Sequence, residues 1–326
     1  MKLKTFVFLA ISLISLNLSA QNQQLRVGLL NGPTCLPAAY LIENKKSISI
    51  NDNSLAVTYE QFADPQALLP KMVKKEIDIG FMPANVAAKV FNAGNKSIIC
   101  ASVVGLGNLA LITSDQSIRH FSDLKGKTVY VAGQGATPEY MFRYLLKENG
   151  LSWTGDDADE KMDFSIPTAQ LAAQLISGKI QYAVLPEPFV TIAKSKSDKV
   201  YTALDFQKEY LELTGEKEIY PLSVMVMRSD FAKENPDLVQ AFLDEYEKAV
   251  GWTITNPAES GKLCQKHNLG LAADIVEKAI PLSNYTYLPA ASSKKSLEKL
   301  YTLFLEYDKT SIGGKLPDEA FYYKKD

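Results

Sequence analysis

Residues 171–188 read LAAQLISGKIQYAVLPEP, and residues 68–85, which lie 103 positions earlier, read LLPKMVKKEIDIGFMPAN. In this register Ile180 falls on Ile77 and Pro186 falls on Pro83. Each copy reads as an amphipathic helix, a charged turn, a buried strand and a proline that stops the strand where it leaves the sheet. The repeat therefore predicts two similar α/β units.

A second pair of segments repeats at nearly the same offset. Residues 26–34 (RVGLLNGPT) match residues 128–136 (TVYVAGQGA) as a strand followed by a loop rich in small residues. One such match between ordinary βα units can arise by chance, whereas two matches at nearly the same spacing, 103 and 102 positions, indicate duplication. A chain of 326 residues also exceeds the usual size of a single core, so we expect two lobes.

Short apolar segments alternate with segments of helical period along the chain. Strands are expected at 26–30, 77–81, 128–131 and 182–185. Helix starts are marked by a capping residue before proline, at Asp64-Pro65, Thr137-Pro138, Asn235-Pro236 and Asn256-Pro257. This alternation predicts an α/β fold with mostly parallel sheets.

The N-terminus has the pattern of a secretory signal peptide. Lys2 and Lys4 precede an apolar run over 6–16, and the small residues Ser19 and Ala20 follow it. The run is too short to span a bilayer of about 30 Å, which favours cleavage near Ala20 over an uncleaved anchor. With residues 1–20 removed, we expect an exported protein of the periplasm.

Charge and cysteine content exclude several classes of protein. Lys and Arg total 35 and Asp and Glu total 37, so no basic field is available for nucleic acid. Cys35, Cys100 and Cys264 match no metal motif and allow at most one disulfide, and we expect all three to be buried thiols. No cofactor and no metal site are expected.

Several motifs together resemble one family. They are residues 123–129 (DLKGKTV), 133–140 (GQGATPEY), 177–188 (SGKIQYAVLPEP) and 224–228 (VMVMR), then Phe231 and Asn235-Pro236-Asp237-Leu238. The chain resembles the type II periplasmic solute-binding proteins of ABC importers, in the nitrate/sulfonate/taurine and thiamine-precursor branch. The resemblance covers nearly the whole chain beyond residue 20, and it identifies the fold better than the ligand.

The resemblance implies a division into lobes and a partner. The first lobe would comprise 21–113 plus 224–326 and the second 114–223, each with a central sheet flanked by helices. Two hinge crossings are expected, near 113–115 and near 221–223. The implied function is the substrate-binding component of an ABC importer, a monomer that delivers a small molecule to a membrane permease.

The ligand should lie where strands end and helices begin in the cleft between the lobes. The candidate residues are Asn31, Gly32, Pro33, Thr34, Phe62, Met82, Pro83 and Asn85 in the first lobe, and Gly133, Gly135, Ala136, Thr137, Glu187 and Tyr220 in the second. The loop 133–137 is the strongest candidate, because its glycines allow close approach and the helix start at Thr137 suits an anionic group. The alternative is a capped helix start that binds only water.

Three of these candidates have two interpretations each. Glu187, between two prolines, either accepts hydrogen bonds from an amine of the ligand or caps the helix that follows. Phe62 and Tyr220 either stack on a flat ligand or form an apolar wall.

Two other functions remain open at this point. An enzyme of the same fold, of the menaquinone or thiamine pathway type, is disfavoured because neither His120 nor His267 is expected to face the cleft. No nucleophile elbow or phosphate-binding loop is present either. A ligand-sensing subunit of a membrane receptor cannot be separated from a transport protein by sequence.

The expected cargo is a small aromatic or heteroaromatic acid. The cleft loops contain no Arg or Lys, which disfavours nitrate, and Leu36, Phe62 and Met82 favour a ligand with apolar surface. A pyrimidine precursor of thiamine ranks ahead of an alkylsulfonate.

Overall fold

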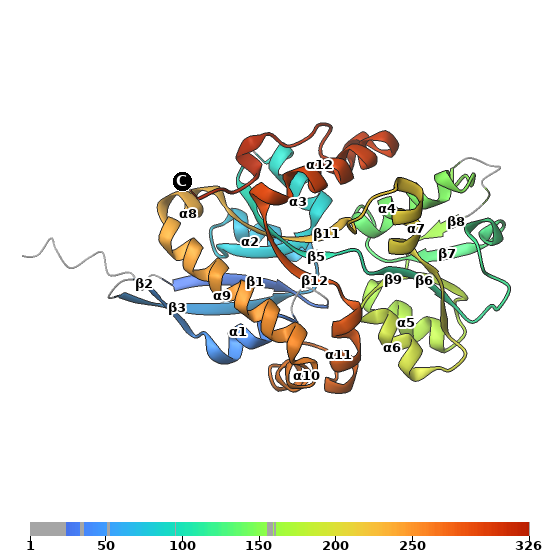
Figure 1. The fold of residues 1–326 in the computed structure, drawn as a ribbon, viewed down its shortest axis with the longest axis horizontal. Helices are drawn as coiled ribbons and strands as arrows, with labels where there is room; N and C mark the ends of the chain where they lie inside the picture. Colours follow the sequence, from blue (N-terminus) through green and yellow to red (C-terminus); the bar gives the residue numbers. More distant parts are fainter. Residues whose placement is uncertain are drawn as a thin grey trace, which may run out of the picture.

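The computed structural model describes residues 24–32, 36–50, 53–94, 96–154, 159 and 161–325. These residues form two sheets, each flanked by helices, which lie one after the other along the longest axis of the molecule (Figure 1). The expected signal peptide, 1–20, lies outside the described residues.

The larger unit is built on a seven-stranded sheet of order β12-β5-β11-β4-β1-β3-β2. Its strands are β1 (Gln24–Leu30), β2 (Ser47–Ile50), β3 (Asn53–Phe62), β4 (Ile79–Pro83), β5 (Ile98–Leu106), β11 (Pro221–Arg228) and β12 (Tyr285–Pro289). Its helices are α1 (Ala38–Asn44), α2 (Pro65–Val73), α3 (Ala84–Ala93), α8 (Ser229–Glu234), α9 (Pro236–Thr255), α10 (Pro257–Lys266), α11 (Ala273–Ala279) and α12 (Ala290–Tyr307). Short 3-10 helices η3 (Ile280–Leu282), η4 (Lys309–Ile312) and η5 (Glu319–Phe321) complete it.

The smaller unit is built on a five-stranded sheet of order β10-β6-β9-β7-β8. Its strands are β6 (Leu109–Thr113), β7 (Thr128–Val131), β8 (Lys161–Asp163), β9 (Tyr182–Pro186) and β10 (Tyr201–Asp205). Its helices are α4 (Thr137–Glu148), α5 (Thr168–Ile176), α6 (Phe189–Lys196) and α7 (Phe206–Thr214), with the 3-10 helix η2 (Phe121–Leu124).

Alternation along the strands divides the core of the larger unit into two layers. Met225 and Met227 of β11 pack with α9, whereas Val224 and Val226 pack on the opposite face with α3 and α12. This is the period of two that places successive side chains on opposite faces of a strand. Both faces of the larger sheet are therefore covered by helices.

The two units confirm the internal repeat in their strand register. β1 pairs in parallel with β4, with Gly28 opposite Gly80, and β7 pairs in parallel with β9, with Tyr130 opposite Ala183. Tyr130 and Ala183 are the positions that the repeat aligns with Gly28 and Gly80. The duplicated segments thus occupy equivalent places in the two sheets.

The fold is α/β as expected, but the pairing in each sheet is mixed. Parallel pairs are confined to β4-β1-β3 and β9-β7-β8, and the remaining pairs are antiparallel. The reason lies in the connections between the sheets. β6 and β11 each start where the chain enters a sheet from the other unit, so both run against the parallel strands beside them.

The chain passes between the sheets at points that differ from the expected ones. The first crossing is at Gly107–Asn108, between β5 and β6, because β6 pairs with β9 in the smaller sheet and so reaches Thr113 inside that unit. The second crossing lies between the end of α7 and Pro221, which already begins β11. The two crossings touch, since the amide of Gly107 donates to the carbonyl of Tyr220 at 2.9 Å.

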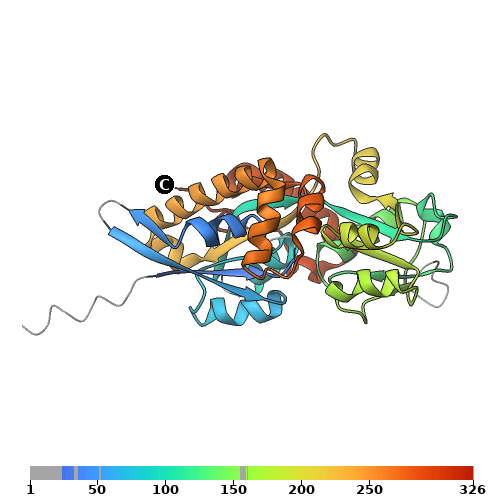
Figure 2. The ribbon, with the colours of Figure 1, turned by 90° about the horizontal axis from the view of Figure 1, so that it is seen from below.

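Helices of both units also pack against one another beside the crossings. The rings of Tyr140 on α4 and Phe304 on α12 are 5.2 Å apart, and the Tyr140 hydroxyl donates to Asp308 at 2.9 Å. On the opposite side, α11 contacts α6, which Figure 2 shows from below. The contacts on these two sides leave a cleft between the units.

Candidate functional site

The cleft between the two sheets has a volume of about 1030 Å3 and is lined from both units. It lies at the carboxyl ends of β1, β3, β4, β7 and β9, where each strand passes into a loop or a helix start. Strand ends of this kind are the usual ligand sites of α/β folds, because backbone groups there are not used by the sheet. The cleft is therefore the candidate ligand site.

Six of the sequence candidates line the cleft. They are Asn31, Gly32, Pro83, Gly133, Gly135 and Ala136. Gly133 and Gly135 have φ angles of 71° and 72°, in the left-handed region that favours glycine, which explains their place in the turn that aims this loop at the cleft. Pro33 and Thr34 lie outside the described residues.

The helix start after this loop already has a negative partner. The amide of Gly135 donates to Oε2 of Glu139 at 2.6 Å, and Glu139 also pairs with Arg143. Glu139 is only 4 % exposed, so this carboxylate occupies the positive end of α4. One backbone amide of the loop 133–137 is therefore already paired with a carboxylate of the chain, and an anionic ligand group at this loop stays a prediction.

Asn85 joins the two units instead of lining the cleft. Its Nδ2 donates to the carbonyl of Gly135 at 2.8 Å and to that of Ser311 at 3.2 Å, and Thr137 Oγ1 donates to its Oδ1 at 3.2 Å. Asn85 and Thr137 are both fully buried. Both candidates thus belong to a contact between α3 and the loop 133–137.

Glu187 accepts a hydrogen bond from the first turn of the helix that follows it, which agrees with the second of its two interpretations. Its Oε2 accepts the amide of Thr191 at 3.1 Å, and the residue is 4 % exposed. Burial raises the pKa of its carboxyl above the usual range, although the hydrogen bonds from Thr191 oppose this. Glu187 is not among the residues that line the cleft.

The remaining three candidates are packed away from the cleft. Phe62 and Met82 point into the core of the larger unit, 7 % and 0 % exposed. Tyr220 is 1 % exposed, donates its hydroxyl to Gln207 at 2.7 Å and supports the second crossing. Phe62 faces the core because side chains alternate along β3 and its neighbours Gln61 and Ala63 line the cleft. Tyr220 precedes β11 and packs against the ring of Tyr210, 5.1 Å away.

The sequence interpretation missed several residues of the cleft. They are Gln61, Asp64, Gln66, Lys89, Thr168, Phe189 and the loop 268–271. Lys89 supplies a cation from α3 that the loops alone do not contain, and Asp64 caps α2 by accepting the amide of Ala67 at 2.9 Å. Gln61 could have been found from strand alternation, since it neighbours Phe62 on β3.

A smaller chamber of about 150 Å3, the inner chamber, lies beside the cleft and the first crossing. It shares Leu30, Asn31, Pro83 and Pro186 with the cleft. Its other walls are Val104, Gly105, Asn108, Pro138, Leu222, Ser223, Tyr246, Ser283 and Tyr285. Since Pro138 and Pro186 come from the smaller unit, the inner chamber is complete only when the units meet.

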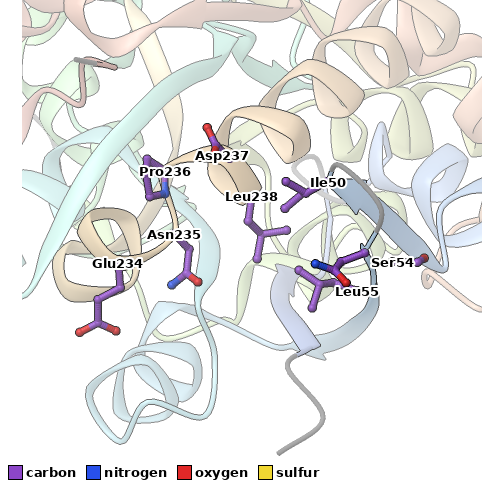
Figure 3. A pocket seen from close by; sticks show the side chains of 9 residues that line it. Ile50, Ser54, Leu55, Glu234, Asn235, Pro236, Asp237 and Leu238 are labelled. Atoms are coloured by element: carbon purple, nitrogen blue, oxygen red, sulfur yellow. The ribbon is translucent and has the colours of Figure 1, made fainter. Parts of the chain in front are cut away.

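A separate pocket of about 480 Å3 lies far from the cleft, within the larger unit. Figure 3 shows the side chains of Asn235 and Leu238 on one side of it and those of Ile50 and Leu55 on the other. This pocket is lined by the β2–β3 hairpin and by the residues around the start of α9. Because one unit forms it alone, movement of the units would not change it.

Other kinds of site are absent from the part of the chain that the structure describes. No group of three or more potential metal ligands occurs there, and no helix there has the length and apolar character needed to cross a bilayer. Cys100 and Cys264 are buried, as expected, and Cys35 lies outside the described residues. His267 pairs with Glu43 at 2.8 Å and is not among the described residues that line the cleft.

Solved structures share the fold of most of the chain. An ABC transporter protein from Parabacteroides distasonis matches with a TM-score of 0.77 and 24% identity, over 93% of this chain and 100% of that one. The periplasmic aliphatic sulphonate binding protein SsuA from Escherichia coli matches with a TM-score of 0.69 and 18% identity, over 91% and 92%. The expected fold of type II periplasmic binding proteins is thereby confirmed.

Sequence comparisons place the chain in a family. The nitrate/nitrite binding protein NrtA of Nostoc sp. is 28% identical over 171 residues, which is 51% of this chain but only 36% of that protein. The model of the NMT1-like family matches residues 19–266, which is most of the chain. In agreement with the resemblance drawn from its motifs, the chain belongs to the NMT1-like family.

Proposed function

We propose that this chain is the substrate-binding component of an ABC importer, which captures a small organic solute in the cleft by closure of its two lobes. The observation that carries the proposal is a cleft of about 1030 Å3 lined by equivalent strand ends of two duplicated units. The names of the relatives, a nitrate/nitrite binding protein and an aliphatic sulphonate binding protein, support a role in binding small solutes.

The two adjacent crossings suit a closing rotation. The chain passes between the units twice, and the bond between Gly107 and Tyr220 holds both passages together. The lobes can therefore rotate about one short axis at the crossings. We propose that the lobes are the units built on the two sheets, with boundaries at 107–108 and 215–220.

The proposed setting follows from the same role. The protein would be exported by the segment 1–20, act as a monomer in the periplasm and deliver its ligand to a membrane permease. The alternatives are an enzyme of the same fold and a ligand-sensing subunit. The enzyme is less supported, because the described residues that line the cleft include neither histidine nor cysteine.

A thermal-shift screen tests this proposal. The protein is exported and processed in a Gram-negative host, unfolded and refolded to remove carried-over ligand, and screened against vitamins, pyrimidines, aromatic acids, sulfonates, nitrate and amino acids. A solute at 100 times its Kd should stabilise the protein by about 2.7 kcal/mol and raise Tm by several degrees.

The outcome also separates binding in the cleft from binding elsewhere. A hit whose shift is lost when Gln61, which lines the cleft, is replaced by tryptophan supports the proposal, because the large ring would obstruct the cleft. The matched control is Ser54→Trp in the remote pocket, which should leave the shift unchanged. A library without any hit, or a hit sensitive only to Ser54→Trp, would count against capture in the cleft.

A further inference from the structure

Five separate segments of the chain each bring a side-chain amide to the cleft. These segments are the end of β1, the end of β3, the first turn of α2, the loop 133–137 and the connection between α10 and α11. The residues, called the cleft amides below, are Asn31, Gln61, Gln66, Gln134 and Asn268. All five are exposed, so solvent or a ligand can reach them. Polar groups that converge on a mainly apolar pocket usually decide which ligand it accepts.

The cleft amides have no task in holding the fold together. None of them hydrogen-bonds through its side chain to another residue that the structure describes. Amides elsewhere do, since Asn92 donates to the carbonyl of Ile312 at 2.6 Å and Gln207 donates to that of Leu109 at 2.9 Å. Asn268 has a backbone reason to be asparagine, because its φ angle is 54°. The other four cleft amides are available for a ligand and have no such reason.

Charge in the cleft favours neither sign strongly. Among the described residues that line it, only Asp64 and Lys89 carry a formal charge, and their signs are opposite. Both are exposed, so water and salt screen them. Apolar side chains such as Leu69 and Val90 line much of the remaining wall. The lining therefore offers neutral hydrogen-bonding groups beside an apolar surface.

The chemistry of an amide decides what it can pair with. Each side-chain amide carries an oxygen that accepts hydrogen bonds and a nitrogen that donates them. An ionised carboxylate or sulfonate only accepts, so it could use the nitrogens of the cleft amides but not their oxygens. When the lobes close, those oxygens would lose water without gaining a donor, which is unfavourable. A ligand that both donates and accepts satisfies both halves.

We propose that the cleft binds an uncharged carboxamide or cyclic amide, whose N–H and C=O groups pair with the cleft amides while its apolar part lies against the wall. This assignment rests on the proposed function and names the ligand class for it. It differs from the aromatic acid expected from the sequence. Gln61 of the larger lobe and Gln134 of the smaller lobe would hold the ligand from two sides, which links recognition to closure.

Matched amides and acids test the ligand class on the unmodified protein after refolding. Isothermal titration calorimetry at neutral pH compares benzamide with benzoate and nicotinamide with nicotinate, and 2-pyridone and uracil extend the panel to cyclic amides. In at least one pair the amide should bind about tenfold more tightly than the acid, because the acid leaves amide oxygens without a donor. N,N-dimethylbenzamide, which is uncharged but has no N–H, should bind more weakly than benzamide.

A pair of double variants assigns this preference to the side chains. Gln61→Leu combined with Gln134→Leu removes one cleft amide from each lobe and should abolish the preference. The matched control is Gln24→Leu combined with Gln181→Leu. These two glutamines are also exposed, one in each lobe, and neither is among the described residues that line the cleft. The control should keep the preference, and the melting curves of both double variants verify that they are folded.

The outcomes separate this inference from the proposed function. Acids that bind as tightly as their amides in both pairs overturn the ligand class, and so does a panel in which no amide binds. A preference that survives in Gln61→Leu/Gln134→Leu overturns the role of the cleft amides. In each case a shift with nitrate, a sulfonate or an acid in the thermal screen would leave solute capture standing. If neither amides nor any library solute bind, both proposals fail.

Discussion

Replacing Asn85 by alanine should loosen the contact between the two lobes. The side chain takes part in three hydrogen bonds, two of which join it to the other lobe at Gly135 and Thr137, while the third reaches Ser311 within its own lobe. All three are lost in Asn85→Ala, and the carbonyls of Gly135 and Ser311 lose a donor. The two hydrogen bonds between the lobes determine the effect on the lobe arrangement, and all three determine the effect on the free energy of unfolding.

The expected magnitude follows from ordinary hydrogen-bond energies. A net contribution of about 1 kcal/mol per bond gives a loss of about 3 kcal/mol in the free energy of unfolding. The two bonds between lobes account for about 2 kcal/mol of this. A loss of about 2 kcal/mol should shift the equilibrium between apposed and separated lobes about thirtyfold towards the separated state.

Asn92→Ala is the matched control on the same helix. Asn92 Nδ2 donates to the carbonyls of Ile312 and Lys315, at 2.6 and 2.7 Å, and both acceptors belong to its own lobe. This variant should lose about 2 kcal/mol of stability at most and leave the arrangement of the lobes unchanged.

Two measurements on both variants decide the matter. Urea unfolding gives the free energies, and small-angle X-ray scattering gives the radius of gyration of the ligand-free protein. Only Asn85→Ala should show a larger radius of gyration than the unmodified protein. If its radius and stability loss equal those of Asn92→Ala, the contact does not hold the lobes together and the reasoning is refuted.

Three further changes test single positions. Gly107→Ala should lower Tm by several degrees, because an added Cβ would clash with the ring of Tyr220 and overpacking costs about 1 to 3 kcal/mol; an unchanged melting curve would contradict this. Gly135→Ala should lower the free energy of unfolding in urea by about 1 to 2 kcal/mol, because the φ angle of Gly135 is 72°. Gly135→Asn should lower it less, since asparagine tolerates this region. Equal losses in the two variants would argue against backbone strain. Glu187→Gln keeps an acceptor for the amide of Thr191 but removes the carboxyl, and burial raises the pKa of that carboxyl. The unmodified protein should therefore lose stability relative to this variant as the pH rises from about 4.3 through the raised pKa. Urea unfolding at pH 4.5 and 7.5 measures this, and a difference independent of pH would show that the carboxyl is not destabilised by burial.

The parts of the site that follow directly from a strand end could be predicted from sequence. Asn31, Gly32 and Gly133 each come one or two residues after an apolar strand, and the direction of a parallel sheet then places them at the cleft. The repeat located the equivalent loops in both lobes. Local pattern sufficed because these positions depend only on neighbouring residues.

The parts that depend on distant contacts could not be predicted. Lys89 lies further along α3 than the loop that was considered, and the loop 268–271 reaches the cleft from the C-terminal half of the chain. The contact of Asn85 with Gly135 joins two lobes whose relative position no local pattern specifies. Sequence periodicity describes an element and its buried face, but not which element of the other lobe it will meet.

The first crossing was misplaced for a related reason. The apolar character of β5 continues into β6, and only Gly107 and Asn108 separate them. The expected crossing lies where an apolar strand meets a polar connection, and the polar stretch 113–115 comes only at the end of β6. The boundary between the two sheets is therefore a short uncharged break inside an apolar run.

The bond between Gly107 and Tyr220 makes residues 108–219 a module with its entry and exit side by side. Such a segment can be exchanged between related proteins in one step, as a surface loop can, without changing the order of strands in the remaining sheet. Recombination could then combine one half of a binding site with many versions of the other half. The geometry of the two chain passages thus provides a route by which the family could diversify its ligands while the scaffold stays constant.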